Sequence, residues 1–137
     1  MLRRTFLAFA LLGLVGIAPA APIANHVLIV SFDGGKPAVI KQSQMPTLTH
    51  AAEQGAVSWE AQTVFPSITL VSHTSMLTGV GPEKHKITWN SWQADKGPVT
   101  VPTIFGIARK AGLHTALFAG KDKFKHLNVP DTLDAFE

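Results

Sequence analysis

Three polar side chains, a carboxylate, a hydroxyl and an amide, are of the types that could together bind a cation and an anion. Asp33 follows the apolar run 27–32 and precedes two glycines, Thr69 lies in F-P-S-I-T, and Asn90 ends G-P-E-K-H-K-I-T-W-N. A carboxylate can bind a divalent cation, and a hydroxyl at a helix start lies beside unpaired backbone N–H groups that attract anions. Taken singly, each has a simpler explanation: Asp33 in an Asp-Gly turn, and Ser67 or Thr69 as a helix cap.

A strand that ends before Asp33 and a helix that begins near Thr69 would position these two side chains. The run 27–32 is almost continuously apolar and rich in β-branched residues, as in a strand buried on both faces. Pro66 disfavours helix at the residue before it, and the apolar residues that follow predict a short helix from Thr69 to Leu77. Because ligands bind beyond the carboxyl ends of strands in open α/β sheets, Asp33 is predicted at such an edge.

The rest of the chain alternates helix-like and strand-like segments. We predict a helix over 45–54, a strand over 57–64, a turn-rich loop over 79–90, a helix within 98–112 with Pro102 in its first turn, and a strand over 114–119. This order predicts an α/β fold, a parallel sheet with helices on both faces. The tail after Gly120 closes no obvious unit, so we expect the domain to be incomplete at its C-terminal end.

Residues 1–20 have the form of an export signal. Arg3 and Arg4 precede an apolar run over 6–17, and A-P-A at 18–20 suits a signal peptidase. We predict cleavage after Ala20, which leaves 21–137 as one domain with no membrane span. The paired arginines resemble a twin-arginine signal, while the general secretory route stays open, and either route makes the protein periplasmic or secreted.

Charge and cysteine content narrow the functional classes. The chain has 12 Lys and Arg against 9 Asp and Glu, and the signal takes two of the basic residues, so the mature chain is nearly neutral. Such a balance gives no nucleic-acid-binding surface. Since there is no cysteine, a metal would be held by histidine and carboxylate side chains.

In this order and at these distances, Asp33, F-P-S-I-T with Thr69, and the loop that ends at Asn90 resemble the type I phosphodiesterase and nucleotide pyrophosphatase family of the alkaline phosphatase superfamily. The resemblance covers about 27–124. It implies an alkaline-phosphatase-like fold, of which 21–137 would be the N-terminal part of the catalytic domain. It also implies two divalent metal ions, with zinc the expected metal.

The resemblance implies hydrolysis of phosphodiester or pyrophosphate bonds in a small phosphate ester or nucleotide, through a phospho-threonine intermediate. Asp33 looks like a metal ligand, Thr69 like the nucleophile that also touches a metal, and Asn90 like the donor to a phosphate oxygen. A free threonine hydroxyl is a poor nucleophile, but contact with zinc favours its alkoxide. Ile68 and Lys86 depart from residues common in the family, which weakens any transfer of nucleotide specificity.

Two alternatives stay open. The family completes its metal sites with Asp and His residues downstream of Asn90, so the second metal site is expected to be incomplete in this chain. The chain would then be a catalytically silent, truncated fragment. The other alternative is a phosphomonoesterase of the same superfamily. The sequence leaves the oligomeric state open.

Other polar and aromatic residues have mainly structural interpretations. Gly120-Lys121 is no phosphate loop, because no Gly stands five residues before Gly120 and Asp122 replaces the required Ser or Thr. We expect His73 to be packed or capping and His85 to lie at the surface. The three tryptophans are predicted to be buried under loops.

Overall fold

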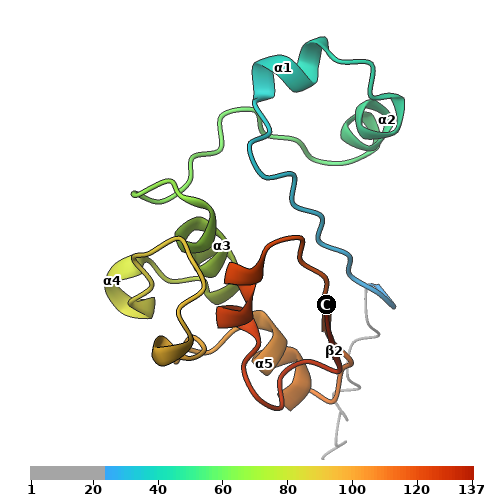
Figure 1. Cartoon of the computed structure of the whole chain (residues 1–137). Helices are drawn as coiled ribbons and strands as arrows, with labels where there is room; N and C mark the ends of the chain where they lie inside the picture. The colour runs from blue at the N-terminus through green and yellow to red at the C-terminus, as the bar shows by residue number, and fades with distance from the viewer. Residues whose placement is uncertain (1–23) are drawn as a thin grey trace, which may run out of the picture. The chain divides into compact units, whose positions relative to one another are not determined.

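A computed structural model describes residues 24–137, and the predicted export signal lies outside these residues. Residues 33–137 form one unit, which contains all helices and strands of the described chain, and residues 24–32 belong to a separate unit. The elements, in order, are α1 (Pro37–Gln42), α2 (Pro46–Gln54), α3 (Thr69–Thr78), α4 (Pro82–His85), η1 (Ala94–Lys96), α5 (Ile104–Lys110), β1 (Ala116–Leu117), η2 (Asp122–Leu127) and β2 (Ala135–Phe136) (Figure 1).

The helix predicted over 45–54 is confirmed as α2. Pro46 occupies its first turn, and Gly55 follows its last residue as the C-cap. Proline suits a first turn because its fixed φ is helical and because no intrahelical partner exists there for the missing N–H. Local sequence signals therefore determine both ends of α2.

Helix α3 begins where the sequence predicts and ends one residue later. Ile68 precedes it in an extended conformation, with φ −105° and ψ 152°. Gly79 ends it in the left-handed region at φ 70°, and the N–H group of Gly79 donates to the carbonyl of Ser75 at 2.9 Å. Glycine adopts this conformation without a steric penalty, so it provides a clean end to the helix.

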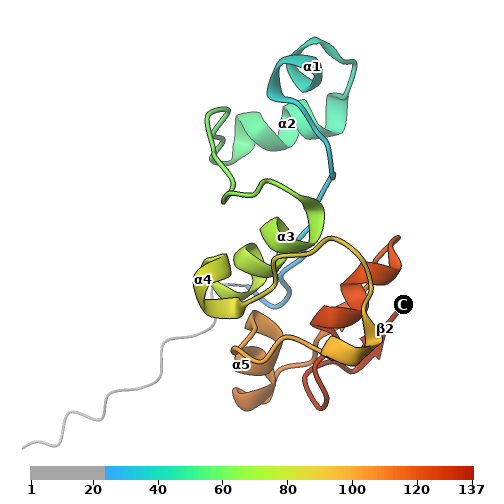
Figure 2. The same cartoon turned by 60° about the vertical axis from the view of Figure 1, so that its left-hand side comes forward.

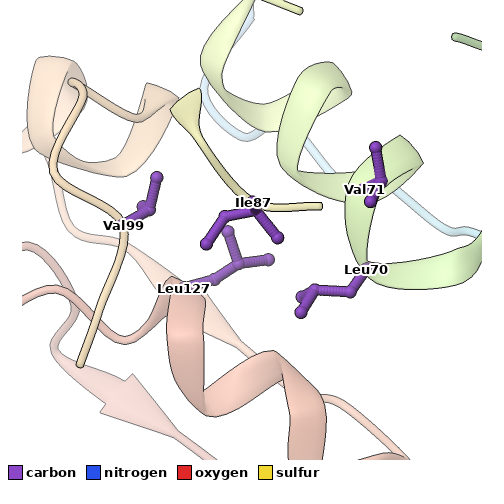
Figure 3. Packing of buried hydrophobic residues seen from close by; sticks show 5 residues of the cluster. All are labelled: Leu70, Val71, Ile87, Val99 and Leu127. Carbon is purple, nitrogen blue, oxygen red and sulfur yellow. The ribbon is translucent and has the colours of Figure 1, made fainter. Parts of the chain in front are cut away.

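The core lies between α3 and the chain that follows it. Helix α3 contacts α4, α5 and η2, and two views show α3 beside α4 (Figures 1 and 2). Figure 3 shows the buried apolar cluster: Leu70 and Val71 from α3, Ile87 and Val99 from the chain between α4 and α5, and Leu127 from η2. Because Leu127 is fully buried, part of the tail after Gly120 packs into this core.

The described residues contain one parallel pair of short strands. Strand β1 pairs with β2 in the register Ala116 to Ala135 and Leu117 to Phe136. The predicted strand over 114–119 is therefore confirmed only at its centre, and its partner comes from the tail. The fold is thus mixed helix with a small parallel sheet.

The strands predicted over 27–32 and 57–64 do not form. Both segments lie outside any helix or strand, and Val27 and Leu28 are 83% and 86% exposed. Hydrophobicity alone cannot make a buried strand, since its backbone N–H and C=O groups need hydrogen-bonding neighbours on both sides. The described residues provide no such neighbours, so the sheet flanked by helices on both faces is not present in them.

Two helices depart from the expected boundaries. Pro82 starts the short helix α4 inside the segment predicted as a loop. Helix α5 begins at Ile104, two residues after Pro102, because the hydroxyl of Thr103 accepts the N–H group of Gly106 at 3.2 Å and acts as the N-cap. Among residues 24–137, no helix has the length and apolar character needed to cross a bilayer.

Candidate active site

The Thr69 hydroxyl faces the Asp33 carboxylate. Thr69 is the first residue of α3, and its Oγ1 donates to Oδ2 of Asp33 at 3.0 Å. The simpler explanation is that the hydroxyl caps its own helix. This explanation is wrong, because the N-cap residue is Ile68 and it makes no capping hydrogen bond from its side chain. The hydroxyl instead contacts a carboxylate 36 residues earlier in the chain.

Asn90 joins the same helix terminus. Its Oδ1 accepts the backbone N–H group of Leu70 at 3.0 Å. That N–H group can only donate, and it has no intrahelical acceptor in the first turn, so the contact fixes which end of the amide is oxygen. The Nδ2 group of Asn90 is thereby left as a donor for another partner. All three side chains singled out in the sequence therefore lie at the start of α3.

Lys121 is a fourth polar residue at this site, and the sequence analysis missed it. Its ammonium group donates to Oδ2 of Asp33, the oxygen that also receives the Thr69 hydroxyl. The only interpretation considered for this lysine was a phosphate loop. A usable signal existed: Lys121 follows the apolar segment 114–119 just as Asp33 follows 27–32.

These contacts favour the ionised form of Asp33. The hydrogen bond from Lys121, and after it the one from Thr69, lower the pKa of the carboxyl below its usual value, against a smaller opposing effect of burial. The carboxylate is consequently ionised at neutral pH. It can accept a hydrogen bond from Thr69 and attract a cation at the same oxygen.

The two histidines near α3 have different environments. His73 is half-buried, its Nδ1–H donates to the Thr69 carbonyl at 2.8 Å, and its ring meets the Phe124 ring edge-on at 5.0 Å, in agreement with a packing role. His85, expected at the surface, is only 1% exposed, so that expectation is wrong. It ends α4 rather than lying in an open loop, and its Nε2–H donates to Ser75 Oγ at 2.9 Å.

The donor set fits part of a metal site. Asp33 Oδ2 and Thr69 Oγ1 lie 3.0 Å apart, which is close enough for both oxygens to bind one cation. Zinc sites in proteins take about four ligands of His, Cys, Asp or Glu type, with water filling an open position. Within residues 24–137, no group of three such side chains is assembled. The described residues could thus supply two oxygen atoms to one cation.

Comparison with known families decides the identity of the chain. Residues 27–110 match the type I phosphodiesterase / nucleotide pyrophosphatase family. The chain belongs to this family. The matched residues include Asp33, Thr69 and Asn90, whereas Lys121 follows the end of the match.

Individual relatives are similar over about half of the chain. An ectonucleotide pyrophosphatase/phosphodiesterase of Caenorhabditis elegans is 35% identical over 65 residues, which is 47% of this chain and 8% of the relative. The bis(5'-adenosyl)-triphosphatase enpp4 of Mus musculus is 34% identical over 68 residues, or 50% of this chain and 15% of the relative. The human ENPP4 protein is 34% identical over 72 residues, or 53% and 16%. No solved structure matches the chain significantly.

The chain therefore spans between 8% and 16% of the length of these curated relatives over the matched regions. The nematode relative is named a pyrophosphatase/phosphodiesterase and the two mammalian relatives are named triphosphatases, which together with the family match places the chain in a family of hydrolases.

Proposed function

We propose that this chain carries the nucleophile half of a metal-dependent phosphodiesterase or nucleotide pyrophosphatase site, with Thr69 as the nucleophile. The observation that carries the proposal is the 3.0 Å contact between Thr69 Oγ1 and Asp33 Oδ2 at the start of α3. A carboxylate, a hydroxyl and a helix N-terminus in one place suit an anionic ester that is attacked by an alcohol. The substrate class is a small phosphate ester or nucleotide.

Each side chain has a distinct task in this mechanism. Asp33 orients the Thr69 hydroxyl by accepting its hydrogen, and it would hold the cation together with Thr69. A bound divalent ion, expected to be zinc, supplies a Lewis acid that lowers the pKa of the hydroxyl. The oxygen of Thr69, having lost its proton to water, then forms a bond to phosphorus while the ester bond to the leaving group breaks and the leaving oxygen departs with the electron pair. Water subsequently attacks phosphorus, the bond to the Thr69 oxygen breaks, and the remaining phosphate monoester (for a nucleotide substrate, the nucleoside monophosphate) is released as Thr69 regains a proton.

The start of α3 would stabilise the charge on the phosphoryl oxygens. The N–H groups of Thr69 and Val71 meet no backbone acceptor within residues 24–137, so they remain as donors to an anion. The Nδ2 group of Asn90 is a further donor, because its Oδ1 is held by Leu70. Fixed donors aimed at developing negative charge are an effective way to lower a reaction barrier.

Lys121 favours a second candidate, a phosphomonoesterase. Its ammonium group adds a positive charge beside the proposed nucleophile. A phosphate monoester is a dianion at neutral pH, whereas a diester is a monoanion, so the monoester gains more from this charge. The relative kcat/KM of the zinc-loaded protein for p-nitrophenyl phosphate and bis(p-nitrophenyl) phosphate separates the two candidates: a monoesterase prefers the former and a diesterase the latter.

The nucleophile is tested by hydrolysis of bis(p-nitrophenyl) phosphate by the zinc-loaded protein. We expect Thr69→Ala to lower kcat by about 10²-fold or more, as is usual when a central catalytic group is removed. Thr78→Ala is the matched control and is expected to leave the rate unchanged, since Thr78 is the last residue of α3 and its hydroxyl bonds only the backbone, donating to the carbonyl of Thr74 and accepting the N–H group of Val80.

Two results would contradict the assignment. If the unaltered protein is clearly faster than the zinc-containing buffer, a Thr69→Ala rate within about twofold of it would remove Thr69 as the nucleophile. A rate for the unaltered protein that does not exceed that of the zinc-containing buffer would support the silent-fragment alternative instead.

A further inference from the structure

His126 is a buried histidine outside the proposed catalytic group, and the chain around Asn90 encloses it. Its side chain is 0% exposed, in η2. Its Nδ1 lies 2.6 Å from the carbonyl of Gly97, and its Nε2 lies 3.1 Å from both the indole Nε1 of Trp89 and the backbone N of Gln93. We call residues 89–97 the Asn90 loop. Both ring nitrogens of His126 are therefore used by this loop.

The partners fix the protonation of the imidazole ring. A carbonyl oxygen can only accept, so Nδ1 carries the hydrogen and donates it to Gly97. The indole and backbone N–H groups can only donate, so Nε2 accepts from Trp89 and from Gln93. His126 in this arrangement is the neutral Nδ1–H tautomer. No other ring state satisfies all three groups.

Aromatic and backbone contacts add to these hydrogen bonds. The Trp89 ring meets the His126 ring edge-on at 5.4 Å, and the Trp92 ring lies tilted against it at 4.5 Å. The backbone of His126 also accepts the N–H group of Val99 at 2.7 Å. The three-residue helix η1 is the only regular element in the Asn90 loop. Contacts with His126 therefore hold several residues of the loop that no helix or strand holds.

A short series of contacts joins His126 to the start of α3. Trp89, which donates to His126, immediately precedes Asn90 in the chain. Asn90 in turn accepts the Leu70 N–H group, one residue after the proposed nucleophile. A shift of Trp89 would move Asn90 from the helix terminus, because the two residues share a peptide bond.

We propose that His126 is a positioning residue, which holds Trp89 and Gln93 so that the Asn90 amide lies at the start of α3. Its importance for catalysis rests on the proposed function, whereas its effect on the Asn90 contact does not. The acceptor at Nε2 is the essential feature, since it binds Trp89, which directly precedes Asn90, and Gln93, three residues after it. The donor at Nδ1 holds Gly97, at the far end of the loop.

Two substitutions separate these features. His126→Gln places an acceptor oxygen close to the position of Nε2, and His126→Asn retains only a donor close to the position of Nδ1. If His126 acts through Trp89 and Gln93, Gln should preserve the Asn90 contact better than Asn. Because Gln is also closer than Asn to His in size, space filling alone gives the same order, and the comparison in the Asn90→Ala background below separates the two explanations.

Hydrogen exchange of the Leu70 amide provides the readout. This N–H group has no intrahelical acceptor, so its protection depends on Asn90 Oδ1. The Gly79 N–H group, bonded to Ser75 at the other end of α3, reports on opening of the helix as a whole. We expect His126→Asn to speed exchange of Leu70 about tenfold more than that of Gly79, as for the loss of one hydrogen bond, and His126→Gln to have a smaller effect.

The same measurement in an Asn90→Ala background completes a double-mutant cycle between His126 and Asn90. Once Asn90 no longer accepts the Leu70 N–H group, His126→Asn should add no further selective exchange at Leu70. Equal acceleration at Leu70 and Gly79, or full additivity with Asn90→Ala, would overturn the proposal. Because hydrogen exchange can be measured without catalysis, this result tests the role of His126 independently of the proposed function.

Kinetics extend the test to the reaction. With bis(p-nitrophenyl) phosphate, His126→Asn should lower kcat more than it raises KM, and this loss should vanish in the Asn90→Ala background. Losses that add in the double variant would show that His126 does not act through Asn90.

Discussion

Lys121 and Asp33, which lie 88 residues apart in the chain, form an ion pair at the oxygen that receives the Thr69 hydroxyl. The side chain of Asp33 is thereby tied both to the start of α3 and to the tail. The negative charge of the proposed cation ligand is consequently paired with a lysine that no local sequence pattern connects with it, and this lysine lowers the pKa of the carboxyl.

The first prediction concerns this charge. Lys121→Met should raise the pKa of Asp33 towards its usual value, because the Lys121 hydrogen bond is the largest cause of the lowered pKa. The carboxyl ¹³C shift of Asp33, followed by NMR during a pH titration, measures the change. Lys123→Met is the matched control, and an equal Asp33 pKa in both variants would argue against the ion pair.

The site residues that could be predicted are those with a recognisable local sequence pattern. Asp33 before two glycines and Thr69 after Pro66 each sit at a change of local structure that the sequence displays, and the structure brings both to one place. Lys121 and His126 were not found, since their partners are 88 residues away for Lys121 and 37 away for the Trp89 contact of His126. Such contacts arise only from tertiary packing.

The fold was predictable to a similar extent. Helix α2 could be predicted because Pro46 and Gly55 are local signals for the start and the end of a helix. The apolar run 27–32 was given the wrong secondary structure, because hydrophobicity states what a segment would bury but not which strand would pair with it. His85 was placed at the surface since a loop sequence does not reveal that α4 turns it towards Ser75.

The second prediction concerns the core. Leu70→Ala should lower the free energy of unfolding by about 2–5 kcal/mol, because Leu70 is 0% exposed and its truncation leaves a cavity. Met76→Ala, on the same helix but 59% exposed, should change it by less than about 1 kcal/mol. Urea denaturation followed by circular dichroism measures both, and equal losses would contradict the packing of α3.

The third prediction concerns the end of α3. Gly79→Ala should destabilise the protein by about 1 kcal/mol, because Gly79 has φ 70° and a side chain there is strained. No atom lies within 4 Å of the added Cβ, so the cost arises from the backbone alone. Gly79→Asn is the informative comparison, since asparagine tolerates this conformation better. Thermal unfolding should rank the variants glycine, asparagine, alanine in decreasing stability, and an alanine variant as stable as the parent would refute the left-handed cap.

The fourth prediction concerns acid sensitivity. Burial lowers the pKa of His85 below its usual value of about 6.5, so the folded protein binds fewer protons at this site than the unfolded chain. Its contribution to stability is therefore complete above about pH 6.5 and is lost as the pH falls through the lower, folded-state pKa. The Nδ1 atom already accepts the Ile87 N–H group at 3.1 Å, which explains why a second proton is unfavourable.

His85→Leu cannot titrate, so its urea midpoint should fall less between pH 7.5 and pH 5.5 than that of the parent, even though the variant loses the bond to Ser75. His50 lies on the exposed surface of α2 and serves as the control position. The urea midpoint of His50→Gln should fall between pH 7.5 and pH 5.5 by as much as that of the parent. An undiminished fall in His85→Leu would mean that another group controls the acid response and that His85 does not contribute measurably to the pH dependence of folding.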